Sequence, residues 1–277
     1  MIQGKYAKKR TPLWYRGAVV LLSGVFLCCA WHLADYWLSA KRQADAYEEL
    51  AAMVEAARPT ADAPDASGPG ETAGEGLPED QVNGDGILVE YAALYGMNPD
   101  MAGWIAIDGT GINYPVMHTP GRKDHYLQRN FEGEQSAWGC IYAREECDLE
   151  TPSDNVTLYG HHMKDGSMFA GLDDYTKREF WEEHPYIRFD TLSEHHVYEV
   201  FAVFITTASR DQGFDYHAFI DAYDETEFDT FIAECLSLSL YDTEIVPEYG
   251  DKILCLSTCE YTQENGRLVV AAVRIDE

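Results

Sequence analysis

The sequence predicts a mainly β domain in which about eight short strands form a closed or nearly closed barrel. The chain of 277 residues contains 18 Tyr and 11 Phe, an aromatic content that is more typical of β-sheet proteins than of helical bundles. From residue 87 onward, short runs rich in Val, Ile, Tyr, Phe and Thr recur along the chain. Turn-forming residues separate several of these runs, as at 108–111 and 264–266.

The individual elements follow from these runs and from the stretches between them. Strands are predicted at residues 104–107, 113–117, 139–143, 155–159, 186–190, 197–206, 252–258 and 268–275. Helices are predicted at 41–57, 87–95, 167–182 and 224–239. Short strands with a few helical insertions indicate a single barrel with added helices.

An apolar segment near the N-terminus predicts a membrane anchor. Residues 1–16 are basic, and residues 17–38 are largely apolar, about the length that a spanning helix needs. Basic residues before such a segment predict a cytoplasmic N-terminus and an extracellular C-terminal part, so the protein is expected in the cell membrane with a single pass. A cleaved signal peptide is the alternative, but no small-x-small cleavage site follows the segment.

The region between the anchor and the globular part reads as a spacer. Residues 39–86 are predicted to form a helical stalk followed by an acidic, flexible linker, which begins near residue 58. The linker is rich in Pro, Gly and acidic residues, a composition that cannot bury a core. The globular domain is therefore predicted to span residues 87–277.

The charge distribution argues against nucleic acid as a partner. The formal net charge is −28, with 20 basic and 48 acidic residues. Seven of the basic residues but only one acidic residue lie within residues 1–42, so the remainder is strongly acidic. Such a surface repels phosphate backbones. Acidity alone identifies no other partner.

The cysteine pattern argues against metal sites and disulfide scaffolds. None of the seven cysteines forms a C-x-x-C pair, so neither a structural zinc site nor a thioredoxin-type motif is expected. No metal and no cofactor are predicted. Two cysteines lie in the apolar segment, and five lie in the globular part: Cys140, Cys147, Cys235, Cys255 and Cys259.

Cys259 is the candidate nucleophile among these thiols. Alternation along residues 252–258 places Cys255, Ser257 and Cys259 on one face of the strand. Cys255 lies deeper in the strand and is expected to be an inert core thiol. Cys259 lies where the strand gives way to a polar loop, so it combines a rigid backbone with access to solvent. Taken alone, a cysteine is more often a core residue than a nucleophile.

Two adjacent histidines end another predicted strand. His161 and His162 follow Gly160, which permits a sharp exit and a close approach of another backbone. A nucleophilic cysteine usually works with a histidine, which accepts or donates the proton. Without further context, two surface histidines at a turn would be the simpler interpretation.

Arg267 opens the last predicted strand. If strands 252–258 and 268–275 pair as neighbours, Arg267 returns close to Cys259. A guanidinium there could donate hydrogen bonds to a developing oxyanion or to a substrate carbonyl. An ordinary surface ion pair is the alternative for any single arginine.

Together these signals resemble the sortase family. The resemblance rests on the strand-end run Leu256-Ser257-Thr258-Cys259, on Gly160-His161 and on Arg267, eight residues after the cysteine. Residues 103–107, 112–116, 159–169 and 250–254 are similar to class B of the family. The resemblance covers residues 87–277 and implies an eight-stranded sortase-type β-barrel with an N-terminal helix and inserted helices. It implies Cys259 as nucleophile, His161 as the catalytic histidine and Arg267 as the catalytic arginine, whereas His162 has no chemical role.

The resemblance also implies a reaction and its partners. A sortase cleaves the C-terminal sorting signal of a surface protein through a cysteine thioester and transfers the acyl group to an amine of a cell-wall precursor. The implied partners are the sorting-signal peptide, the amine-bearing precursor and the membrane that holds the N-terminal helix. A pilin-polymerising sortase, a non-catalytic surface binding module and a secreted cysteine protease are the alternatives. The presence of Cys, His and Arg argues against the binding module, and a Cys and an Arg on neighbouring strands argue against the protease.

Overall fold

The computed structural model describes residues 13–58, 81–207, 213–261 and 265–275. The chain divides into two compact units, Met1–Ala46 and Tyr47–Glu277. Residues 59–80, which hold most of the predicted linker, and residues 1–12 of the predicted basic tail lie outside the described residues. The predicted domain boundaries therefore stay a prediction.

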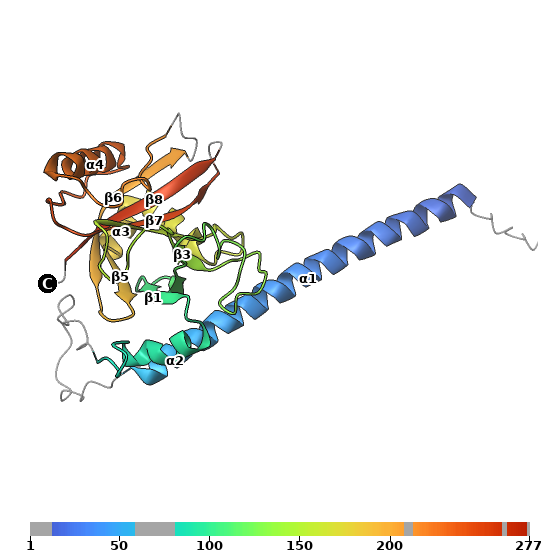
Figure 1. Cartoon of the computed structure of the whole chain (residues 1–277). Helices are drawn as coiled ribbons and strands as arrows, with labels where there is room; N and C mark the ends of the chain where they lie inside the picture. The colour runs from blue at the N-terminus through green and yellow to red at the C-terminus, as the bar shows by residue number, and fades with distance from the viewer. Residues whose placement is uncertain (1–12, 59–80, 208–212, 262–264, 276–277) are drawn as a thin grey trace, which may run out of the picture. The chain divides into compact units, whose positions relative to one another are not determined.

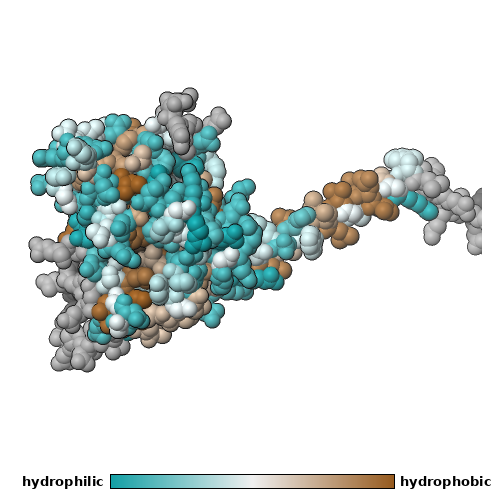
Figure 2. Space-filling model, viewed as in Figure 1, coloured by the Kyte–Doolittle hydropathy of each residue, from teal (hydrophilic) through white to brown (hydrophobic). Residues whose placement is uncertain are grey.

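The first unit contains most of helix α1 (Leu13–Ala57), which continues into the second unit. Among the described residues, α1 is the one helix long and apolar enough to cross a membrane. Its large apolar side chains, such as Val20, Phe26 and Leu33, are exposed to solvent. Figure 2 shows hydrophobic side chains gathered along this part of the helix. An exposed apolar surface of this length is unfavourable in water and agrees with the predicted anchor.

The last turns of α1 belong to the second unit. Tyr47, Leu50 and Val54 are buried, and their spacing places them on one face of the helix. The Tyr47 hydroxyl donates a hydrogen bond of 2.8 Å to the carbonyl oxygen of Gly139. Residues 47–57, which the sequence assigned to a stalk, thus pack within the same compact unit as residues 87–275.

The described part of the second unit contains eight strands that close into a barrel, as predicted (Figure 1). The strands are β1 (Met101–Ala106), β2 (Asn113–Met117), β3 (Ile141–Ala143), β4 (Asn155–Tyr159), β5 (Tyr186–Thr191), β6 (Val197–Thr207), β7 (Ile253–Glu260) and β8 (Gly266–Arg274). Their order around the barrel is β1-β2-β3-β4-β7-β8-β6-β5. The pairs β2–β3 and β4–β7 are parallel, and the other pairs with a recorded register are antiparallel.

One further helix precedes β1, and three are inserted between strands of the described residues. They are α2 (Val89–Met97), the 3₁₀ helix η1 (Phe169–Thr176), α3 (Arg178–Glu183) and α4 (Glu225–Leu238). The prediction of a single helix over 167–182 was wrong. Lys177 adopts an extended backbone (φ −103°, ψ 126°) and separates η1 from α3.

Helix α4 covers one face of β6, β7 and β8. Its buried residues Phe228, Ile232 and Cys235 belong to one apolar cluster with Cys255 of β7 and Ala271 of β8. The Asp224 side chain caps the helix, because it accepts a hydrogen bond from a backbone N–H of the first turn. Farther along β7, toward the strand ends, this face of the sheet carries polar residues in place of apolar ones.

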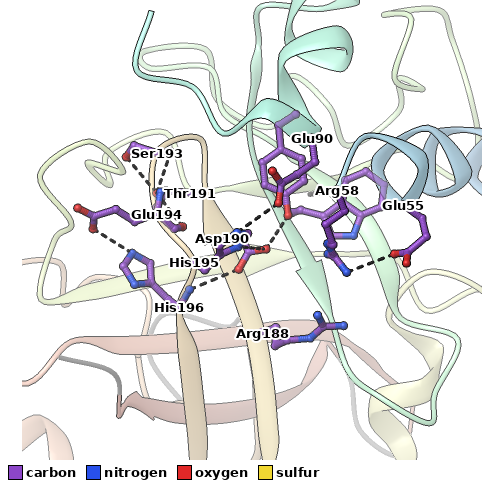
Figure 3. Close-up of polar contacts among 12 residues, drawn as sticks. Glu55, Arg58, Glu90, Arg188, Asp190, Thr191, Ser193, Glu194, His195 and His196 are labelled. Atoms are coloured by element: carbon purple, nitrogen blue, oxygen red, sulfur yellow. Dashed lines mark hydrogen bonds and ion pairs between the residues drawn. The ribbon is translucent and has the colours of Figure 1, made fainter. Parts of the chain in front are cut away.

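A buried cluster of ionisable side chains connects α2 to the barrel (Figure 3). The His195 ring lies 3.2 Å from the Glu90 carboxylate and 3.0 Å from the Asp190 carboxylate. The Tyr91 hydroxyl donates a further hydrogen bond of 2.5 Å to Asp190. All four side chains are buried, and buried polar groups are tolerated when they have hydrogen-bond partners. The cluster links α2 to β5 and to the turn before β6.

Candidate active site

The register of β7 and β8 places Cys259 and Arg267 side by side. The two residues are direct partners in the antiparallel ladder. Directly opposite residues in such a ladder point to the same face, with Cβ atoms about 4.5–5.5 Å apart. The predicted pairing of the two strands is confirmed, and it brings the two candidate side chains together.

The parallel pairing of β4 with β7 brings His161 to the same face. Tyr159 is the ladder partner of Ser257, and the Gly160 N–H donates a 3.1 Å hydrogen bond to the Ser257 carbonyl. His161 lies two residues beyond Tyr159, as Cys259 lies two residues beyond Ser257. β4 ends at Tyr159, and alternation continued for two more residues predicts His161 at the level of Cys259 and on the same face.

Glycine is required before His161 because the backbone is tightly enclosed. A Cβ atom on Gly160 would lie 2.6 Å from the side-chain carbon Cδ1 of Ile141 and 2.6 Å from the ring of Phe169. Both neighbours are buried in the core. The small residue allows β4 to pass close to η1 and then to present His161 on the opposite face.

The hydrogen bond of His161 fixes which ring nitrogen is available for chemistry. Its Nε2 atom lies 2.7 Å from the carbonyl oxygen of Leu127. A carbonyl oxygen can only accept a hydrogen bond, so Nε2 carries a proton. In the neutral ring, Nδ1 is then the basic nitrogen. Leu127 was not a candidate from the sequence, because a backbone acceptor leaves no signal in the residue type.

His162 is engaged elsewhere. Its Nε2 atom lies 2.6 Å from a carboxylate oxygen of Asp173 in η1. Its ring also contacts Tyr261 edge to face, with 5.2 Å between the ring centroids. The two adjacent histidines thus have partners on different elements, as expected if their side chains point to opposite sides.

Cys259 differs from the other thiols of the second unit in its exposure. Cys259 is half-buried, whereas the other four are buried. Burial raises the pKa of Cys140 to about 12 and that of Cys147 to about 11. Burial also raises the pKa of Cys235 and of Cys255 well above the ordinary value. These four thiols are therefore held in the unreactive protonated form near neutral pH.

Arg267 lines a cleft with a volume of about 320 Å³. The guanidinium uses Nη1 to donate a 2.9 Å hydrogen bond to the Gly266 carbonyl, and a guanidinium has five N–H donors in all. The cleft also borders Leu127, whose carbonyl holds His161, and Tyr159 at the end of β4. Arg267 is the one candidate catalytic residue among the described residues that line the cleft, whereas His161 and Cys259 are not part of this lining.

One wall of the cleft is the segment 213–217, which a buried hydrogen bond attaches to β7. The Tyr216 hydroxyl lies 2.6 Å from Oγ of Ser257. Burial raises the pKa of Tyr216 to about 12, so the phenol stays neutral. Arg144 and Tyr159 contribute to the opposite side, where burial raises the pKa of Tyr159 and the neighbouring Arg144 opposes the shift. The sequence did not indicate these contacts.

Comparison with known proteins decides the family. A sortase domain model matches residues 105–275, more than half of the chain. The chain belongs to the sortase family. Sortase B of Staphylococcus aureus is 33% identical over 189 residues, which are 67% of this sortase and 75% of that protein.

Solved structures agree with class B. Sortase B from Bacillus anthracis in complex with AAEK1 matches with a TM-score of 0.69 and 30% identity, over 87% of this sortase and 100% of that chain. The Staphylococcus aureus sortase B–substrate complex matches with a TM-score of 0.70 and 27% identity, over 86% and 99% of the two chains. The sortase-type barrel is confirmed, and the protein is a cysteine transpeptidase of the sortase B type.

The described part of this sortase offers no metal centre. Within it, no group of three or more His, Cys, Asp or Glu side chains is arranged to hold a metal ion.

Proposed function

We propose that this sortase is a membrane-anchored transpeptidase that cleaves a C-terminal sorting signal through a thioester on Cys259 and transfers the acyl group to an amine of a cell-wall precursor. The observation that supports the proposal is the ladder pairing of Cys259 with Arg267, beside the strand β4 that precedes His161. A substrate complex has been solved for sortase B of Staphylococcus aureus, which supports a role in substrate turnover for this sortase.

In the first step, the Cys259 thiolate attacks the scissile carbonyl of the sorting signal. Negative charge develops on the carbonyl oxygen, and the Arg267 guanidinium donates hydrogen bonds to it. As the peptide C–N bond breaks, the leaving amine takes a proton from Nδ1 of His161. The products are a Cys259 thioester and a released peptide with a free amino terminus.

In the second step, the acceptor amine attacks the thioester carbonyl. His161, now unprotonated at Nδ1, takes the proton that the amine loses. The C–S bond breaks, the Cys259 thiolate is regenerated, and a new amide bond joins the two substrates. A thioester suits this sequence because it persists until an amine arrives.

The proposed topology is a cytoplasmic N-terminus and an extracellular catalytic unit. The basic residues before the apolar part of α1 support this orientation. External protease on intact protoplasts should cut the chain within residues 58–86, which lie on the proposed extracellular side. Complete protection of the unit would contradict the orientation.

Mass spectrometry of the trapped acyl-enzyme tests the function. The full chain is incubated with a panel of sorting peptides, and the acyl mass should appear on Cys259 and disappear in Cys259→Ala. Added precursor amine should discharge the adduct into an amide product. A folded protein that forms no adduct with any peptide would favour a binding module. Release of free acid in the presence of amine would indicate a protease, and preference for a protein lysine would indicate pilin polymerisation.

A further inference from the structure

A second hollow lies on the far side of the segment that walls the cleft. This groove has a volume of about 650 Å³ and runs between residues 214–219 and helix α4. Its floor is aromatic. The rings of Phe219 and Phe231 stack with their centroids 4.2 Å apart, and the ring centroids of Phe214 and Phe231 are 5.7 Å apart. Phe214 and Phe219 are only partly buried, so the groove exposes ring surface to solvent.

Carboxylates surround this aromatic floor. Asp215, Glu227 and Glu234 line the groove and are exposed, and the described lining includes no basic side chain. Aromatic faces and carboxylates both attract cations. A lysine or arginine has an apolar stem that packs on rings and a charged head that reaches the rim. The groove is therefore complementary to a basic side chain.

The groove adjoins the site of chemistry. Phe214 and Asp215 line both the groove and the catalytic cleft. The Phe214 N–H donates a 3.0 Å hydrogen bond to Oγ1 of Thr206 in β6. Thr206 is the ladder partner of Arg267 in β8, and Arg267 is in turn the ladder partner of Cys259 in β7. Two strand spacings amount to about 10 Å. An extended peptide covers that distance with about three residues.

We propose that this groove binds a basic side chain of the amine-bearing acceptor, about three or more residues from the nitrogen that attacks the thioester. The inference rests on the proposed function. The reaction requires a second substrate, and the groove lies beside the cleft that Arg267 lines. The groove gives the acceptor a separate binding surface that still reaches the thioester.

Acceptor selectivity tests the proposal. Peptides with a free N-terminal amine and Lys, Ala or Glu at the fourth position serve as acceptors, with one sorting peptide as donor. The full chain is compared with Glu234→Gln, Glu234→Lys and Asp229→Asn, the last being an exposed acid on the same helix outside the groove lining. Rates of thioester formation and of amide formation are measured separately.

The wild type should prefer the Lys acceptor over the Glu acceptor. For the Lys acceptor, Coulomb attraction at about 6 Å in water predicts a KM about threefold higher in Glu234→Gln and about tenfold higher in Glu234→Lys. Both effects should shrink in 1 M salt, because screening is then strong at this distance. Thioester formation and the Asp229→Asn kinetics should stay unchanged.

The outcomes separate the inference from the proposed function. Absence of any thioester in the wild type would overturn the proposed function and this inference with it. Normal thioester formation with equal KM for Lys and Glu acceptors would overturn the inference alone. If Glu234→Lys raised the KM for the sorting peptide and left the KM for the acceptor unchanged, the groove would bind the donor. That result would also overturn the inference.

Discussion

The burial of four thiols and the partial exposure of Cys259 predict a large difference in alkylation rate. The thiolate is the reactive form, and each unit by which a pKa is raised lowers its fraction tenfold at a given pH. The pKa of Cys147 is raised from 9.0 to about 11, and that of Cys140 to about 12. At pH 7.5, their thiolate populations are thus about 100-fold and about 1000-fold below that of an ordinary thiol.

Site-resolved mass spectrometry measures this difference. The folded full chain is treated with iodoacetamide at pH 7.5, and modification is followed at each cysteine of the second unit. We expect Cys259 to react at least about 100-fold faster than Cys147, with turnover lost in step with its modification. As the pH rises toward 11, the Cys147 rate should rise about tenfold per unit, because its thiolate then becomes populated. Cys255→Ala should retain most of its turnover.

Unfolding provides the control, because the five thiols should react at similar rates in guanidinium chloride. If Cys140, Cys147, Cys235 or Cys255 were modified as fast as Cys259 in the folded protein, the burial argument would be refuted. If full alkylation of Cys259 left turnover intact, its assignment as nucleophile would fail.

Four further substitutions test the neighbouring groups. Arg267→Lys keeps the charge but loses the planar set of N–H donors. The kcat/KM with a sorting peptide should therefore fall about 10²–10³-fold, while the Tm stays near normal. Near-normal kinetics would show that the planar donors are not needed. His161→Ala should lower turnover by orders of magnitude and His162→Ala much less, and equal losses in folded variants would defeat the assignment. Tyr216→Phe leaves the buried Ser257 hydroxyl without its 2.6 Å partner, which should lower the free energy of unfolding by about 1–3 kcal/mol. Tm should fall by about 2–4 °C for each kcal/mol lost. An unchanged Tm would contradict a stabilising role for this hydrogen bond.

The sequence was most informative where the chain is regular. Alternation along β7, together with the expected pairing of β7 and β8, correctly placed Cys259 opposite Arg267. The first inference uses the two-residue repeat of side-chain direction along a strand, and the second uses the short connection between β7 and β8. Both are local properties of the sequence. The buried stripe Tyr47, Leu50 and Val54 was also present in the sequence as a helical repeat, but the acidic linker that follows suggested a separate stalk.

Tertiary contacts of irregular segments were beyond the sequence. The Leu127 carbonyl that orients His161 comes from a loop, and any residue type could supply it. Tyr216 lies in a segment without periodicity, so its hydrogen bond to Ser257 could not be anticipated. Part of the cleft wall comes from such segments, whereas the three candidate catalytic residues lie at or just beyond the ends of strands.

The position of β7 in the barrel has a consequence for how the enzyme matures. Thr258 Oγ1 donates a hydrogen bond to the Gly160 carbonyl across 98 positions of sequence, and β7 lies between β4 and the final strand β8. Contacts between such distant residues form late, because a long loop must close first. During synthesis from the N-terminus, the chain should therefore carry His161 without Cys259 and Arg267 until its last strands arrive. The catalytic centre is assembled in the same event that closes the barrel, so truncation at the C-terminus should abolish activity and folding together.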